Sequence, residues 1–124
     1  MTGDEVRAGA TSPALPESEV DPSLRRAFAV LGKRWNGVLL AALAGGPATF
    51  AVLHREIGAI SDSVLCERLR ELSDAGLVER GVEPGPPIAV RYALSGAGTA
   101  LLPALDALAA WARDHLAASG ESGP

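Results

Sequence analysis

The chain has 124 residues, of which 48% are hydrophobic and 21% charged, with 15 acidic and 11 basic residues. This length is sufficient for one domain with a single core. One cysteine excludes a disulfide scaffold. The longest unbroken apolar run, residues 38–44, is far shorter than the roughly 20 residues that a membrane span needs.

The acidic excess lies at the two ends of the chain. Residues 21–116 contain ten acidic and ten basic residues, so nucleic-acid binding by this part requires local clustering of arginine and lysine. The first twenty residues are rich in Pro, Ser, Thr, Gly and Glu, and they carry no apolar stretch that could act as a secretory signal. We therefore expect a cytoplasmic protein with a disordered tail at 1–20, a folded domain at 21–118 and a flexible tail at 119–124.

Two helices are predicted in the first part of the domain. Asp21-Pro22 begins the first, because aspartate can cap free amides and proline fits the first helical position, and Gly32 ends it. The second helix is predicted within residues 33–46 and ends at a Gly-Gly-Pro sequence. Its expected apolar stripe consists of Trp35, Val38, Leu39, Ala42 and Leu43.

Two shorter helices follow, each with a capping residue. Thr49 caps the third, which closes at Gly58, and Ser61 caps the fourth, for which Gly76 is the expected left-handed terminator. Core spacing marks Phe50, Leu53 and Ile57 in the third helix and Leu65, Leu69 and Leu72 in the fourth.

A change of period predicts a β-hairpin. Residues 77–83 form its first strand, and Pro84-Gly85-Pro86-Pro87 excludes regular structure after it. In residues 88–94 the larger apolar side chains alternate with Ala and Arg, which is typical of a half-buried strand. The side chains expected to face inward are Ile88, Val90, Tyr92 and Leu94.

The last predicted element is a long helix capped by Ser95, with Pro103 inside it as an expected bend. One apolar stripe consists of Leu101, Leu105, Leu108 and Ala112, and Leu102, Ala109 and Leu116 widen it. The fold class is therefore mainly α with a small β-hairpin (α+β), and the order of elements is that of a winged helix-turn-helix.

Several motifs in this order resemble the HxlR-type transcriptional regulators, bacterial relatives of the MarR winged-helix repressors. They are LGKRW at 31–35, GPATF at 46–50, ISDSVLCERLRELSDAGLVER at 60–80, PP at 86–87, RYALSGAG at 91–98 and LLPALDALAAWA at 101–112. The resemblance extends from about Asp21 to Leu116.

The resemblance implies a homodimer that binds operator DNA, with the helix from Ser61 as recognition helix and residues 77–94 as wing. Two-fold symmetry predicts a pseudo-palindromic operator. In this family the first and last helices build the dimer interface, and these helices do carry more apolar surface than the remaining elements could cover. The expected interface residues are Leu24, Phe28, Leu101, Leu105, Leu108, Trp111, Ala112 and Leu116.

Candidate DNA contacts on the fourth helix follow from a rotation of 100° per residue with the leucines facing inward. The outward arc contains Ser63, Cys66, Glu67, Arg70 and Asp74, while Ser61 and Asp62 lie at the amino end and Arg68 borders the core. Ser63 and Cys66 lie where base edges would be reached, and Arg70 where a phosphate or guanine would be. Glu67 and Asp62 would repel phosphates unless they accept a hydrogen bond from a cytosine amino group, so affinity is expected to be modest and strongly salt-dependent.

Three further candidates lie outside that helix. Arg91 alternates with inward residues of the wing, and Arg80 lies near the base of its first strand, so each is either a DNA contact or an ordinary solvated arginine. Thr49, beside free helix amides, is a phosphate ligand, a plain cap, or both.

Other chemistry has little support in the sequence. Cys66 is either a redox sensor on the reading face or a small neutral side chain. His54 and His115 lack partners at metal-ligand spacing, and no cofactor motif or catalytic constellation is present, so we expect neither metal, cofactor nor enzymatic activity. Trp111, Trp35 and Phe28 either line a cavity for an unknown small-molecule effector or simply pack.

These observations favour a sequence-specific regulator of transcription, acting mainly as a repressor by steric exclusion at a promoter. The alternative is a winged-helix module that contacts proteins and binds DNA weakly or not at all. The neutral charge of the domain and the acidic residues on its reading helix support that alternative.

Overall fold

The computed structural model describes residues 19–118 as parts of two units, which divide between Lys33 and Arg34. The predicted tail at 119–124 and all but the last two residues of the tail at 1–20 lie outside the described residues. The first unit contains α1 (Pro22–Leu31). The second contains α2 (Asn36–Ala42), the 3-10 turn η2 (Leu43–Gly45), α3 (Phe50–Ile57), α4 (Asp62–Asp74), β1 (Val78–Glu83), β2 (Ala89–Leu94) and α5 (Gly96–His115).

Helix α1 begins and ends where the sequence predicts. The Asp21 carboxylate accepts a hydrogen bond from the Ser23 amide at 2.8 Å, and Gly32 closes the helix by donating to the Phe28 carbonyl. Leu24 and Phe28, one turn apart and therefore on one face of α1, are both exposed.

The start of α2 differs from the prediction. Trp35 lies in the left-handed region at φ 83°, a conformation that costs a bulky residue about 1–3 kcal/mol, and the helix begins only after it. The Arg34 guanidinium lies 4.6 Å from the Trp35 ring centroid, and Trp35 is half-buried rather than a full core residue. Val38, expected in the buried stripe, is exposed, whereas Leu40, which lies outside the predicted stripe, is fully buried.

The core of the second unit is built mainly from leucines on α2, η2, α3 and α4. Its members with at most 2% exposure are Leu39, Leu40, Leu43, Leu53, Leu65, Leu69 and Leu72. Each such side chain contributes about 1.5–3 kcal/mol by leaving water. Helix α4 supplies three of these leucines from one of its faces. Burial of that face fixes the orientation of α4 on the second unit.

The predicted caps of α3 and α4 are confirmed. The Thr49 hydroxyl accepts from the Val52 amide at 3.3 Å, and the Ser61 hydroxyl accepts from the Val64 amide at 3.2 Å. Gly76 has φ 80°, the left-handed conformation expected after α4.

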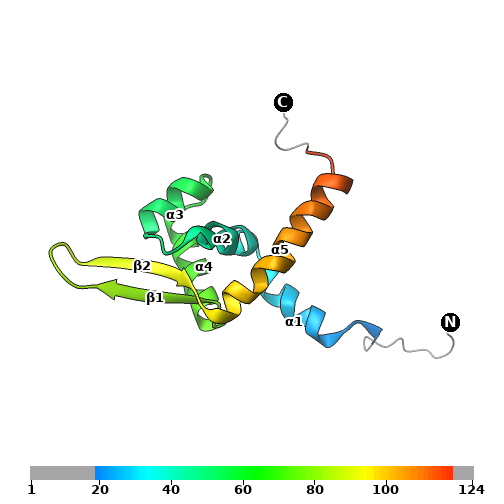
Figure 1. Cartoon of the computed structure of the whole chain (residues 1–124), viewed down its shortest axis with the longest axis horizontal. Helices are drawn as coiled ribbons and strands as arrows, with labels where there is room; N and C mark the ends of the chain where they lie inside the picture. The colour runs from blue at the N-terminus through cyan, green and yellow to red at the C-terminus, as the bar shows by residue number, and fades with distance from the viewer. Residues whose placement is uncertain (1–18, 119–124) are drawn as a thin grey trace. The chain divides into compact units, whose positions relative to one another are not determined.

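Strands β1 and β2 pair in antiparallel register from Val78 opposite Leu94 to Glu83 opposite Ala89. The hairpin projects from the helices of the second unit (Figure 1). The expected alternation of burial along residues 88–94 is wrong, since every residue of β2 is half-buried and Ile88 lies before the strand with 71% exposure. A two-stranded ribbon that leaves the helices has no second layer to bury one face, so only its base reaches the core.

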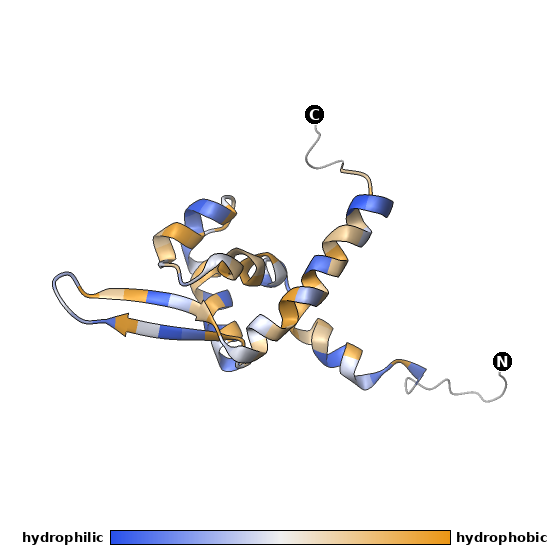
Figure 2. Ribbon diagram, in the orientation of Figure 1, coloured by the Kyte–Doolittle hydropathy of each residue, from blue (hydrophilic) through white to orange (hydrophobic). Residues whose placement is uncertain are grey.

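Helix α5 is capped as predicted, by the Ser95 hydroxyl accepting from the Gly98 amide at 3.1 Å. The same hydroxyl donates to the Gly76 carbonyl at 2.6 Å, which ties the start of α5 to the end of α4. Apolar residues recur along α5 (Figure 2), and the stripe is only partly covered: Leu101, Leu102 and Leu105 are half-buried and Leu108 is exposed.

Among residues 19–118, no single helix combines the length and apolarity needed to cross a membrane. Only α1 and the segment of α2 and η2, taken together across the break between them, reach that length and composition.

Candidate nucleic-acid interface

Helices α3 and α4 form the helix-turn-helix, and a side-chain contact joins them. The His54 Nε2 atom lies 3.1 Å from the Asp62 Oδ1 atom. His54 therefore has an acidic partner, contrary to the prediction that it stands alone. Nevertheless, no group of three or more His, Cys, Asp or Glu residues suited to a metal ion occurs in the described part of the chain.

The side of α4 opposite the three buried leucines is exposed, as the 100° rotation predicts. Ser63, Cys66, Glu67, Arg70 and Asp74 are all exposed, and Asp62 is 81% exposed at the amino end. Ser61 is exposed too, and its hydroxyl lies 3.4 Å from that of Ser63. The helix therefore presents a continuous polar surface to solvent.

This surface divides into two stripes. Cys66, Arg70 and Ser73 follow one another at spacings of four and three residues and lie toward the hairpin, where they line a hollow with Arg80 and Tyr92. Glu67 and Asp74, seven residues apart, follow a neighbouring stripe that does not line the hollow, and Asp62 lies at the amino end, one turn before Cys66. The sequence does not identify Ser73 as part of the stripe that lines the hollow. Ser73 is a half-buried serine next to Leu72, and its residue type and spacing do not distinguish it from an ordinary surface position.

Arg68 differs from the other candidates. Its guanidinium lies 3.0 Å from the Glu71 carboxylate one turn later, and only 19% of its side chain is exposed. The positive charge of Arg68 is therefore compensated by Glu71 within α4. Little of the Arg68 side chain is available to contact DNA.

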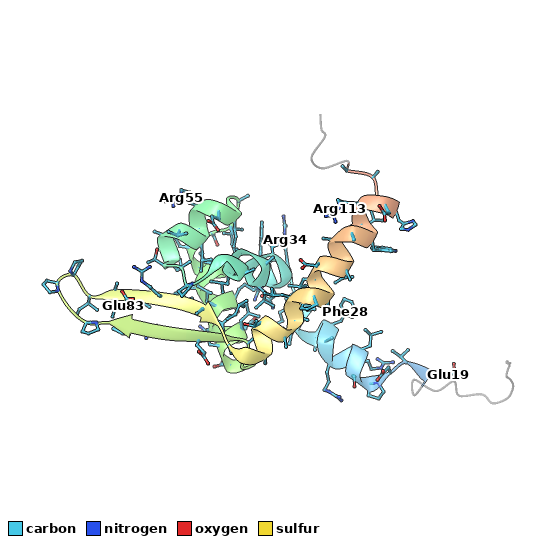
Figure 3. All side chains as sticks on the ribbon, viewed as in Figure 1. Glu19, Phe28, Arg34, Arg55, Glu83 and Arg113 are labelled. Atoms are coloured by element: carbon cyan, nitrogen blue, oxygen red, sulfur yellow. The ribbon has the colours of Figure 1, made fainter. Side chains whose placement is uncertain are left out.

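The wing carries its two arginines on opposite faces. Arg80 lies directly opposite Tyr92 in the register, whereas Arg91 lies opposite Gly81, and successive strand residues point to opposite faces. The Arg91 Nε atom is 3.2 Å from the Glu83 carboxylate, whose position in the outer part of β1 is labelled in Figure 3. Arg80 has no ion pair with another described residue.

Thr49 is half-buried, and its hydroxyl is engaged as the cap of α3. This geometry accounts fully for the residue as a cap. Its role as a phosphate ligand stays a prediction.

The residues expected at a dimer interface are exposed to different degrees. Leu24 and Phe28 of α1 are exposed, as are Leu108, Trp111 and Leu116 at α5, with Trp111 at 53%. Leu101, Leu105 and Ala112 are half-buried. The Trp111 ring lies 6.3 Å from that of His115 one turn later.

The model of the HxlR-like helix-turn-helix family matches residues 30–119, which cover the helix-turn-helix, the wing and α5. The chain belongs to this family. It is 43% identical over 91 residues to the HTH-type transcriptional regulator YodB of Bacillus subtilis, covering 73% of this chain and 81% of YodB. It is 34% identical to YvaP of the same organism, covering 82% and 94% of the two chains.

Solved structures agree with this membership. The reduced form of YodB from Bacillus subtilis is 39% identical with a TM-score of 0.72, covering 85% of this chain and 99% of that one. The redox regulator HypR in its oxidised form is 27% identical with a TM-score of 0.72, covering 77% and 98%. This HxlR-like protein is therefore a transcriptional regulator with a winged helix-turn-helix domain, and not an enzyme.

Proposed function

We propose that the protein binds double-stranded DNA in the cytoplasm as a homodimer, at a pseudo-palindromic operator, and represses transcription by excluding the polymerase from the promoter. Helix α4 enters the major groove and the hairpin lies along the adjacent backbone. The observation that carries the proposal is the exposed polar side of α4 opposite three fully buried leucines. The leucines hold the helix on the domain and leave the other side available to a groove.

The homodimer is supported by apolar side chains that the monomer leaves in water. Leu108 and Trp111, three residues apart on one side of α5, are exposed, as is Leu116 at its end, and contiguous exposed apolar surface marks interaction sites. A two-fold axis would place two α4 helices about 34–36 Å apart, which is one turn of DNA. A pseudo-palindromic operator follows from the two-fold symmetry, and the separation of its half-sites follows from that spacing.

Charge gives the proposed complex a particular salt dependence. The folded part is neutral, and acidic side chains share the exposed side of α4 with Arg70. Attraction to DNA therefore depends on a few arginines. Each arginine that pairs with a phosphate releases counterions from the DNA, so binding weakens steeply as the salt concentration rises.

The test is a binding measurement on the full chain with DNA from the intergenic region that flanks its gene. We expect sequence-dependent binding of modest affinity at about 50 mM salt that weakens by at least tenfold at about 200 mM, against a scrambled duplex as control. Equal affinity for both duplexes would contradict sequence-specific regulation.

A second candidate function is a protein-interaction module, and one observation favours it. Asp62, Glu67 and Asp74 add three acidic side chains to the exposed surface of α4, which suits a basic protein surface better than a phosphate backbone. Absence of any DNA binding at low salt would favour this candidate.

The signal that relieves repression is a further part of the proposal. The relatives include diamide-treated and quinone-bound forms of YodB, and HypR is described as a redox regulator. This chain has one cysteine, Cys66, exposed on α4, so thiol chemistry would act directly on the reading helix. If diamide weakens DNA binding, Cys66→Ser should abolish that effect, and an unaltered response would eliminate Cys66 as the sensor.

A further inference from the structure

A hollow of about 260 Å³ lies between α4 and the wing. Helix α4 contributes Cys66, Leu69, Arg70 and Ser73 to its lining, and the two strands contribute Arg80 and Tyr92. Its walls therefore come from both elements that the proposed function assigns to DNA.

The charge of the lining is of one sign. Arg70 and Arg80 line the hollow and no acidic residue does. Neither arginine forms an ion pair with another described residue, whereas Arg68 is paired with Glu71 and Arg91 with Glu83. Helix α4 and the wing carry four arginines, and two of them are paired with acidic residues of the protein. The other two, Arg70 and Arg80, both line the hollow.

The rest of the lining strengthens an interaction with an anion. Tyr92 and Ser73 carry hydroxyl groups that can donate hydrogen bonds. The core residue Leu69 borders the hollow as well. Arg70 and Arg80 are both exposed, so water partly screens their attraction for a bound anion, and the two hydroxyl groups add directional hydrogen bonds to it.

The hollow is held in shape by the surrounding backbone. Arg80 and Tyr92 are direct partners in the hairpin, and Tyr92 is also bridged to Ala48 by backbone hydrogen bonds of 2.9 and 2.8 Å. On the other wall, Leu69 anchors α4 in the core. Little ordering of the backbone is then required when an anion binds.

We propose that this hollow is a phosphate-binding site in which Arg70 and Arg80 hold the same phosphate group, so that one anion joins the reading helix to the wing. Guanidinium groups suit this task because their planar donors pair with two phosphate oxygens at once. The phosphate belongs either to the DNA backbone, in which case this inference rests on the proposed function, or to a free phosphate-bearing molecule.

The first experiment does not depend on DNA. The full chain, labelled with ¹⁵N, is titrated with inorganic phosphate and, separately, with chloride at matched ionic strength. We expect phosphate-specific shifts of the Ser73, Arg80 and Tyr92 amides. The shifts should disappear in the double variant Arg70→Gln/Arg80→Gln. They should persist in Arg113→Gln, because Arg113 lies on α5, where Figure 3 labels it, and does not line the hollow. Circular dichroism checks that the double variant is folded.

The second experiment places the phosphate on DNA. Each phosphate of a half-site is replaced in turn by a neutral methylphosphonate, and affinity is measured for the wild type and the double variant. We expect one position at which the replacement weakens wild-type binding by about tenfold to hundredfold. The same replacement should change the affinity of the double variant by less than about twofold.

The outcomes are distinct. A DNA position at which the replacement weakens the wild type but not the double variant supports a site that binds a phosphate of the DNA backbone. Phosphate-specific shifts without such a position support a site that binds a free phosphate compound. Neither shifts nor coupling would overturn the inference, even if the protein binds DNA well. A wild-type protein that fails to bind unmodified DNA would instead contradict the proposed function and leave the phosphate titration to decide this inference alone.

Discussion

The Nε2 atom of His54 on α3 lies 3.1 Å from the Oδ1 atom of Asp62 in the first turn of α4. Because the Asp62 side chain is 81% exposed, this interaction contributes less than about 1 kcal/mol to stability. An acidic residue in the first turn also interacts favourably with the helix dipole. For the proposed function its position matters more, since the carboxylate lies at the end of α4 that faces DNA.

Replacing this carboxylate should therefore strengthen DNA binding. We expect Asp62→Asn to raise affinity by roughly fivefold at low salt, because two charges about 4 Å apart in water interact by about 1 kcal/mol. The gain should shrink as salt rises. Fluorescence anisotropy at several salt concentrations measures it, with Glu56→Gln on α3 as the control for net charge. Weaker binding by Asp62→Asn would indicate that this carboxylate accepts a hydrogen bond from a base.

Close packing between the start of α5 and the end of α4 leads to a second prediction. Gly98 is buried so tightly that an added Cβ would collide with the Leu77 carbonyl oxygen, whereas Gly96 has open space around its Cβ position. We expect Gly98→Ala to destabilise the protein by about 1–3 kcal/mol. Gly96→Ala should stabilise it by up to about 1 kcal/mol, because alanine loses less entropy in a helix. Urea unfolding of the two variants provides the comparison, and equal stabilities would contradict it.

Much of this fold could be predicted because its signals are local. The capping residues Asp21, Thr49, Ser61 and Ser95 each lie next to the amides they bind, so their spacing alone identifies the helix starts. The leucine stripe of α4 follows from helix geometry in the same way, and it fixes the exposed side that carries the proposed function.

The errors concern features that depend on distant parts of the chain. The left-handed backbone at Trp35 and the exposure of Ile88 are set by how neighbouring elements pack, which periodicity does not encode. The pairing of Arg91 with Glu83 depends on the register of the hairpin, and it can be found only once that register is known. The hollow that joins Arg70 to Arg80 cannot be predicted from the sequence for the same reason.

The core of the second unit leads to a third prediction. Leu65 is fully buried, so Leu65→Ala should lower the free energy of unfolding by about 2–5 kcal/mol, because apolar surface returns to water and a cavity is left behind. Val82→Ala, at an exposed position on β1, is the matched control and should cost less than about 1 kcal/mol. Similar destabilisation of both variants would show that α4 is not held by its leucine face.

The exposed aromatic residue of α5 leads to the last prediction. If α5 contributes to the proposed dimer, Trp111→Ala should weaken self-association by at least about tenfold, because large aromatic side chains dominate such interfaces. Sedimentation velocity at micromolar concentration measures this, with Arg113→Gln as a control on the same helix. The variant should also lose affinity for a full palindrome while keeping its affinity for a half-site, because each subunit retains an intact α4 and wing. A wild-type protein that sediments as a monomer at these concentrations, or a variant that loses half-site binding too, would contradict the assignment of α5 to the dimer.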